Sequence, residues 1–274
     1  MNIFAQKEEK AKKINSAMSK IKHVIAVSSG KGGVGKSSVA VNLAIALAQK
    51  GYKTGLADAD VYGPSVPTLF NIENESVYGS EIDGISYMMP FERYGIKIMS
   101  IGFFVEKEKP LIWRGIMASN TLNQLLVETY WGELDYLVID TPPGTGDILL
   151  SLAQDFPIAG VIIVCTPQQL AVADVRRAVN MYRNEKLNVR ILGLVENMAY
   201  FSPKDAPDRQ YFIFGKDAAK ELAAELSLDL LVQIPITEDF SQANDSGNPV
   251  ALDFASVEGK VFAQLANEVD KRMK

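Results

Sequence analysis

The feature that most constrains this chain is a glycine-rich segment at residues 30–38, which reads Gly-Lys-Gly-Gly-Val-Gly-Lys-Ser-Ser. It follows an apolar run at 23–27 that is typical of a strand, and it precedes a helical run that extends to residue 50. The part from Gly30 to Ser37 matches the phosphate-binding pattern Gly-x-x-x-x-Gly-Lys-Ser/Thr. In such a loop, successive backbone N–H groups and the helix N-terminus bind phosphate oxygens. The segment therefore predicts a strand–loop–helix unit that binds a nucleotide phosphate.

Side chains of the loop suggest more specific roles. We expect Lys36 to reach the β- and γ-phosphates of ATP and the hydroxyl of Ser37 to hold Mg²⁺. Lys31 has no role in the bare pattern, so we expect it to reach a phosphate too, across a dimer interface. The residues expected to surround the phosphates are Gly30, Lys31, Gly32, Gly33, Val34, Gly35, Lys36, Ser37 and Ser38.

Apolar and helical runs alternate along the rest of the chain. Runs typical of strands lie at 24–28, 53–58, 96–101, 135–140, 160–165, 189–195 and 230–234. Helical runs lie at 37–50, 115–131, 168–186, 216–226, 238–245 and 255–272. This alternation predicts an α/β fold with a doubly wound, mostly parallel sheet that is covered on both faces. We expect residues 1–22 to form a helical extension and residues 23–274 to form a single domain.

Composition limits the choice of partners and compartment. A net charge of −5 and a pI near 5.1 do not suit a general nucleic-acid binder. One cysteine among 274 residues rules out a disulfide framework, and no apolar run is long enough for a membrane span. We therefore expect a cytoplasmic protein. The lysine-rich stretch at 7–22 is interpreted as a solvated leading helix or, alternatively, as a basic interaction arm.

Two further carboxylate motifs follow predicted strands. The run at 137–140 ends in Asp140, as in a Walker B strand whose carboxylate holds Mg²⁺, and Gly144 lies where a backbone N–H can approach the γ-phosphate. The strand at 53–58 ends in Asp58, followed by Asp60. Asp60 is the candidate for orienting the attacking water, and Asp58 is expected nearer the water shell of the metal. Alternatively, Asp58 caps a turn.

These motifs together resemble a known family. The lysine at the second loop position is similar to the deviant Walker A motif of the MinD, ParA and nitrogenase iron protein class of P-loop NTPases. Four further motifs resemble the Mrp/ApbC iron–sulfur cluster carrier ATPases. They are Asp-Ala-Asp-x-x-Gly-Pro-Ser from residue 58, Ile-Trp-Arg-Gly at 112–115, Asp-Thr-Pro-Pro-Gly-Thr-Gly-Asp at 140–147 and Glu-Asn-Met at 196–198.

The resemblance implies a homodimer that encloses ATP and Mg²⁺, with Lys31 reaching the nucleotide of the partner subunit. It also implies slow ATP hydrolysis, with Lys31, Lys36 and Asp60 in catalytic roles. Asn197 is expected to contact adenine or, alternatively, to cap a strand end, and the backbone at Pro235 is expected to close the base pocket. Proteins of iron–sulfur assembly, or recipients of the cluster, are the implied partners.

One departure from the family pattern concerns cysteine. Carriers of this family typically have Cys-x-x-Cys after the Glu-Asn-Met segment, and the matching positions here fall near Pro203 and Ala206. Cys165 ends an apolar strand and is expected to be an ordinary core residue. A [4Fe–4S] cluster held in the usual way is therefore in doubt. The alternative function is a nucleotide-gated positioning or assembly switch, as in MinD and ParA, without a cluster.

Overall fold

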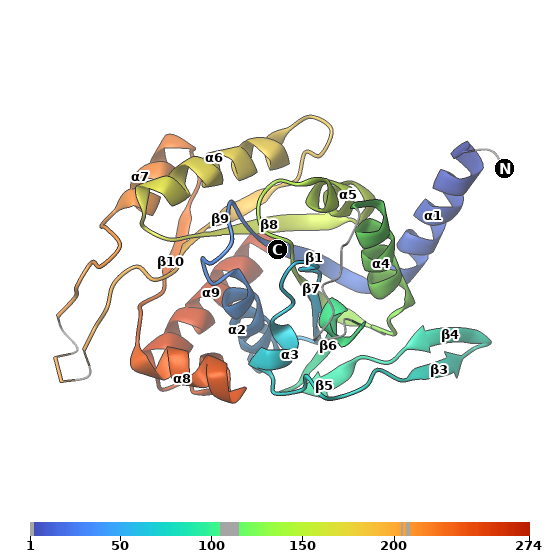
Figure 1. Ribbon diagram of the computed structural model, residues 1–274, viewed down its shortest axis with the longest axis horizontal. Coiled ribbons are helices and arrows are strands. Elements are labelled where there is room, and N and C mark those ends of the chain that lie inside the picture. The colour runs from blue at the N-terminus through green and yellow to red at the C-terminus, as the bar shows by residue number, and fades with distance from the viewer. Residues whose placement is uncertain (1–2, 105–114, 204, 207–208) are drawn as a thin grey trace.

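The computed structural model describes residues 3–104, 115–203, 205–206 and 209–274. Within these residues, eight strands form one sheet in the order β10-β9-β8-β1-β7-β2-β6-β5, and helices cover both of its faces (Figure 1). All neighbouring strands in the sheet run parallel except β5, which is antiparallel to β6. The prediction of a doubly wound, mostly parallel sheet is confirmed.

The parallel strands lie within a few residues of the predicted runs. They are β1 Ile21–Ser29, β2 Thr54–Asp58, β6 Ile96–Ser100, β7 Leu134–Asp140, β8 Ile158–Cys165, β9 Ile191–Glu196 and β10 Leu230–Gln233. Five of the helices match the predicted ones closely: α2 Lys36–Gln49, α4 Gly115–Glu128, α6 Gln169–Arg183, α8 Glu238–Ser246 and α9 Val257–Met273. A sixth, α7, is shorter than predicted at Ala218–Glu225.

Several short elements were not predicted. They are β3 Gly79–Ile82, β4 Ile85–Met88, β5 Phe91–Arg93, α3 Val66–Leu69, α5 Asp147–Asp155 and the 3₁₀ turns η1 Ile101–Phe104 and η2 Val250–Leu252. Most are too short to show an apolar period. The β3–β4 hairpin did carry a sequence signal, the Asp-Gly pair at residues 83 and 84. Both residues have positive φ, as an Asp-Gly hairpin turn requires.

The central strands are buried because helices cover both faces of the sheet. In β1, Ile25 and Val27 pack in the core with α2 and α9, while Val24 and Ala26 pack in the core with α4, α5 and α6. This alternation follows from the two-residue period of a strand. Such strands are apolar on both faces, which explains why they were recognisable in the sequence.

The strand register brings the polar strand ends to one edge. Val27 pairs with Asp140, Asp140 with Asp58, and Asp58 with Ser100. On the other side of β1, Cys165 pairs with Glu196. Strand β1 lies between β7 and β8, so the loop after it opens at the point where ligands bind in doubly wound sheets.

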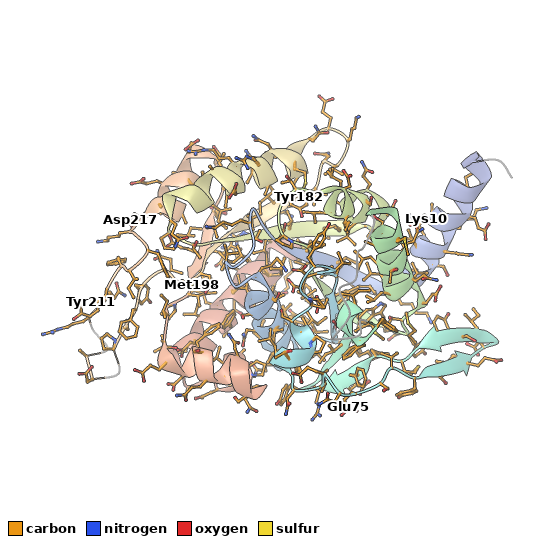
Figure 2. The ribbon with its side chains drawn as sticks, in the orientation of Figure 1. Lys10, Glu75, Tyr182, Met198, Tyr211 and Asp217 are labelled. Atoms are coloured by element: carbon orange, nitrogen blue, oxygen red, sulfur yellow. The ribbon has the colours of Figure 1, made fainter. Side chains whose placement is uncertain are left out.

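The two terminal helices differ in how they pack. Helix α1, Ile3–Met18, buries Ile14 and Met18, and its Lys10 pairs with Asp155 at 2.7 Å (Figure 2). The expected boundary after residue 22 stays a prediction. Helix α9 packs in the core through Leu265 and Val269, although Val257 at its start is exposed. Among the described helices, none is long and apolar enough to cross a membrane.

Candidate functional site

The glycine loop adopts a conformation that other residues would strain. Gly33 and Gly35 have φ angles of 77° and 79°, in the left-handed region that favours glycine. A Cβ atom on Gly35 would lie 2.2 Å from the side-chain nitrogen of Asn197. Helix α2 begins at Lys36 without a side-chain cap, so its first N–H groups remain directed at the loop. This arrangement suits an anion at the helix N-terminus.

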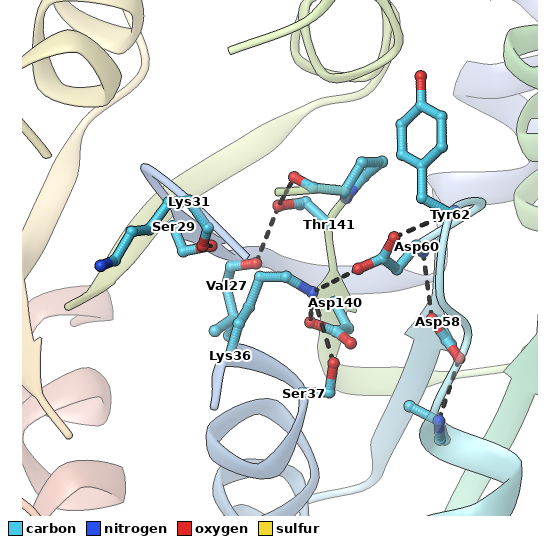
Figure 3. Close-up of polar contacts among 12 residues, drawn as sticks. Val27, Ser29, Lys31, Lys36, Ser37, Asp58, Asp60, Tyr62, Asp140 and Thr141 are labelled. Atoms are coloured by element: carbon cyan, nitrogen blue, oxygen red, sulfur yellow. Dashed lines mark hydrogen bonds and ion pairs between the residues drawn. The ribbon is translucent and has the colours of Figure 1, made fainter. Parts of the chain in front are cut away.

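Lys36 lies among the carboxylates at the strand ends (Figure 3). Its Nζ is 2.6 Å from Oδ1 of Asp140 and 3.3 Å from Oδ2 of Asp60, and Ser37 Oγ lies 3.5 Å away. Both Lys36 and Asp140 are buried. The structure therefore brings together four of the predicted residues: the loop lysine, its neighbouring serine and two of the carboxylates.

These charges perturb one another. Burial lowers the pKa of Lys36, but the carboxylates of Asp140 and Asp60 outweigh it, so the net shift is upward. Burial and, second to it, the nearby Asp140 charge raise the pKa of Asp58 to about 7, although Ser100 and Lys36 oppose the shift. Burial also raises the pKa of Asp140, and Lys36 opposes that shift. Lys36 is thus a cation that opposes the upward pKa shifts of these buried carboxylates.

Asp58 is held by donors from the protein. Its Oδ1 accepts from the backbone N–H of Asp60 at 3.1 Å, and its Oδ2 accepts from the Ser100 hydroxyl at 2.8 Å and from the N–H of Val66 at 3.2 Å. Asp58 therefore fixes the turn after β2, as in the alternative reading of its role. Its expected place near the metal stays a prediction.

Asp60 faces the lysine from that turn. Its Oδ1 accepts from the backbone N–H of Tyr62 at 3.2 Å, which leaves Oδ2 directed at Lys36 (Figure 3). The residue is 7 % exposed, whereas Tyr62 is 68 % exposed and points away from the carboxylates. Asp60 is thus oriented by its own turn and faces Lys36 of the glycine loop; its expected role with the attacking water stays a prediction.

The donor set fits Mg²⁺ bound together with phosphate. Oδ2 of Asp140 is buried and has no hydrogen-bond partner among the described residues. The Ser37 hydroxyl lies on the same side of the Lys36 ammonium group as Asp140 (Figure 3). No group of three or more metal-binding side chains was found in the described part of the chain. Mg²⁺ needs no such group, because it is usually held by one or two carboxylates, waters and substrate phosphates.

The loop after β7 closes against the glycine loop. Gly144 has a φ of 86°, and its N–H donates to the carbonyl of Ser29 at 2.9 Å. The hydroxyl of Thr141 donates to the carbonyl of Val27 at 3.0 Å. Gly144 is therefore next to the loop, and its N–H bonds to the protein in this structure; its expected approach to the γ-phosphate stays a prediction.

Asn197 contacts the loop itself. Its side-chain nitrogen donates to the carbonyl of Val34 at 2.9 Å, and its backbone N–H donates to the carbonyl of Cys165 at 2.8 Å. Pro235 follows Ile234, whose N–H donates to the carbonyl of Glu196. The adenine contacts expected of Asn197 and Pro235 stay predictions.

Lys31 points away from the other charges of the site. Its Nζ donates to Oε1 of Gln168 at 3.3 Å, on the far side of the loop from Lys36 (Figure 3). Its expected role across a dimer interface stays a prediction.

The region where relatives are expected to carry a cysteine pair contains no thiol. Pro203 and Ala206 lie in an arm that leaves the carboxyl end of β9 after Asn197 and returns through Tyr211, which pairs with Phe201 (Figure 2). Cys165 is buried as predicted, and burial, together with Glu196, raises the pKa of its thiol to about 12. Most of the expected motif at 112–115 lies outside the described residues.

Sequence reasoning missed two residues of the site. Ser100 anchors Asp58, and Gln168 binds Lys31. Both lie at or just after the carboxyl ends of strands, at the edge where ligands bind, so their positions were the available signal. Neither belongs to a recognised motif, because their partners depend on strand order rather than on spacing.

Comparison with known proteins agrees with this geometry. A family model described as ParA, NUBPL iron-transfer P-loop NTPase, matches residues 20–270. The iron–sulfur cluster carrier protein of Aquifex aeolicus is 49 % identical over 249 residues, which cover 90 % of this chain and 66 % of that protein. The iron–sulfur cluster transfer protein NUBPL of Mus musculus is 45 % identical, over 93 % of this chain and 78 % of its own length.

Solved structures show the same fold. A nucleotide-binding protein from Archaeoglobus fulgidus, in complex with ADP, has a TM-score of 0.76 and 40 % identity, and the match covers 87 % of this chain and 91 % of that one. The cell division ATPase MinD of Pyrococcus furiosus has a TM-score of 0.62 at 21 % identity, covering 91 % of this chain and 98 % of that one. From its sequence and its fold, this chain belongs to the ParA/NUBPL family of iron-transfer P-loop NTPases.

Proposed function

We propose that this chain is an ATPase that binds Mg²⁺-ATP and hydrolyses it slowly as a homodimer, in iron–sulfur cluster assembly or transfer. The observation that carries the proposal is the contact of Lys36 with Asp140 and Asp60 directly beside a glycine loop. A lysine and a carboxylate at these positions are the usual means of neutralising phosphates and holding their metal. The ADP in the related structure from Archaeoglobus fulgidus supports a nucleotide as the ligand.

Each residue then has a distinct task. The backbone of the loop surrounds the phosphates, and Lys36 turns from the carboxylates to the β- and γ-phosphates. Ser37 and Asp140 would hold Mg²⁺, which supplies positive charge for the phosphates. Asp60, released from Lys36, accepts a hydrogen bond from the attacking water. The oxygen of that water bonds to the γ-phosphorus as the bond to the β–γ bridging oxygen breaks, and ADP leaves.

The role in iron–sulfur chemistry is supported by the named relatives but not by a cysteine pair. Two relatives are called iron–sulfur cluster carrier or transfer proteins. The chain has one cysteine, Cys165, which is buried and far less acidic than a free thiol. A cluster needs thiolate ligands as a rule, so a partner protein would supply them or hold the cluster itself.

A second candidate function is favoured by this same absence of a cysteine pair. A dimeric ATPase without cluster ligands can act as a nucleotide-gated switch that positions or assembles other proteins. The two functions share the ATPase site and differ in whether the protein changes the transfer of clusters to an acceptor.

Paired substitutions test the ATPase site. Lys36→Ala should abolish binding of a fluorescent ATP analogue, because it removes the cation that neutralises the phosphates. Asp60→Asn should keep that binding and lower the rate of phosphate release about 100-fold, because a neutral amide is a much weaker acceptor and base for the attacking water than a carboxylate. Glu133→Gln, on the surface, is the control and should leave both unchanged. Turnover like that of the wild type in Asp60→Asn would remove Asp60 from the mechanism.

A further inference from the structure

The side chain of Lys31 is held within its own subunit. Lys31 is half-buried, and its ammonium group donates to Oε1 of Gln168 at 3.3 Å. It lies on the side of the loop opposite to Lys36 and the carboxylates (Figure 3). A lysine in this position does not contribute to the cluster of charges around Asp140.

The side chain of Gln168 is not needed by the helix that it precedes. Gln168 is the N-cap residue of α6, with an extended backbone, and its side chain makes no capping hydrogen bond. Its Oε1 instead accepts from two donors, the ammonium group of Lys31 and, at 3.5 Å, the hydroxyl of Thr166. Because Thr166 is buried, its hydroxyl is a fixed donor that orients the amide oxygen of Gln168 toward Lys31.

The backbone keeps Lys31 near α6. A Cβ atom on Gly30 would lie 2.4 Å from the carbonyl carbon of Asp174, in the second turn of α6. The start of the loop is therefore packed directly on this helix, and Gly30 is needed for that approach. Lys31 is the next residue, so its distance from the N-terminal end of α6 is set by main-chain packing.

We propose that Gln168 is a positioning residue for Lys31: it holds the lysine in the nucleotide-free monomer and releases it when a second copy of the chain presents a bound nucleotide. The inference rests on the proposed cross-subunit role of Lys31. The hydrogen bond must break before the ammonium group reaches a phosphate of the partner, so its strength opposes ATP-dependent dimerisation. A hydrogen bond of a half-exposed charged group corresponds to a change of about two- to tenfold in an equilibrium constant.

Two substitutions change this contact in opposite directions. Gln168→Ala removes the acceptor and should tighten dimerisation about threefold, whereas Gln168→Glu adds an ion pair and should weaken it about tenfold. Sedimentation velocity with a non-hydrolysable ATP analogue measures the dimer dissociation constant. Gln124→Glu adds the same charge at an exposed position on α4 and is the matched control. Nucleotide affinity of the monomer, measured at low protein concentration, should be the same in all four proteins.

A double substitution separates the contact from other effects. In a Lys31→Ala background, neither change at Gln168 should alter dimerisation, because the side chain that it holds is gone. An effect of Gln168→Glu that persists without Lys31 would overturn the inference. Weak dimerisation of Lys31→Ala together with unchanged dimerisation in both Gln168 variants would overturn it while leaving the cross-subunit role intact. Normal dimerisation of Lys31→Ala would overturn both the inference about Gln168 and the cross-subunit role of Lys31.

A second measurement follows the lysine in the monomer, without nucleotide. After reductive ¹³C-methylation, Lys31 gives an NMR signal that can be assigned by its loss in Lys31→Arg. That signal should move in Gln168→Ala and stay in place in Gln124→Ala. An unmoved signal in Gln168→Ala would show that the two side chains are not in contact, whatever the dimerisation data.

Discussion

A single lysine balances the charges of the proposed ATPase site. Lys36 is the cation that contacts Asp140 and Asp60, and burial raises the pKa of both Asp140 and Asp58. If Lys36 turns to a phosphate, these buried carboxylates lose their counter-charge. An uncompensated buried charge costs several kcal/mol, so a second cation must arrive with the nucleotide. Nucleotide and Mg²⁺ should therefore bind cooperatively.

This coupling can be measured by removing the metal. Chelating Mg²⁺ should weaken binding of a fluorescent ATP analogue to the wild-type protein by about tenfold or more. In Asp140→Asn the buried charge is absent, so the same treatment should change the affinity much less. Asp155→Asn, which alters a carboxylate at the end of α5, should behave like the wild type. Equal losses in wild type and Asp140→Asn would show that Asp140 does not couple the two ligands.

Among the secondary-structure elements, α9 is fixed to the sheet by one carboxylate. Oδ1 of Asp270 accepts from the hydroxyls of Tyr52 at 2.8 Å and Tyr136 at 3.1 Å, and its Oδ2 lies 3.0 Å from Nζ of Lys274. Burial alone would raise the pKa of Asp270, but these partners lower it to about 2. Helix α9 packs with α2, the helix that begins at the loop. Asp270 therefore stabilises the helical layer of α2 and α9, which covers the sheet next to the nucleotide loop.

The lowered pKa of Asp270 sets the sign of its contribution to the pH dependence of stability. The folded-state pKa lies below the unfolded value of 3.8, so the stabilisation is present above about pH 4 and is lost as the pH falls toward 2. Asp270→Asn should reduce the free energy of unfolding by about 2 kcal/mol at pH 7. Urea titrations at pH 7 and pH 3 should show the difference from wild type shrinking at the lower pH. A difference of the same size at both pH values would contradict this role of the ionised carboxylate.

How far the sequence predicts the structure depends on whether an element carries its own signal. Buried parallel strands such as β7 are continuous apolar runs, and the loop from Gly30 to Ser37 is a motif, so both were recognisable. Helix α3 has only four residues, which is too few to show a helical period. The contact of Lys31 with Gln168 joins residues 137 positions apart, and only the order of strands brings them together.

At the scale of the whole molecule, the fold places the nucleotide loop and the arm that contains Pro203 and Ala206 at the same edge of the sheet, where the parallel strands end. The arm leaves the carboxyl end of β9 after Asn197, which itself contacts the loop through Val34. Backbone pairing of Phe201 with Tyr211 and Ile236 holds the base of the arm. In this chain the arm therefore keeps a defined base beside the proposed ATPase site without presenting a thiol.

The iron content of the reconstituted protein tests most directly whether this P-loop NTPase carries a cluster on its own side chains. The full chain is reconstituted with iron and sulfide under anaerobic conditions, passed through gel filtration, and assayed for iron, acid-labile sulfide and visible absorbance. A dimer offers two thiols, both from the buried Cys165, and a [4Fe–4S] cluster needs four ligands as a rule. We predict that almost no iron stays with the protein. Retention of about four irons per dimer, with matching sulfide, would contradict the account.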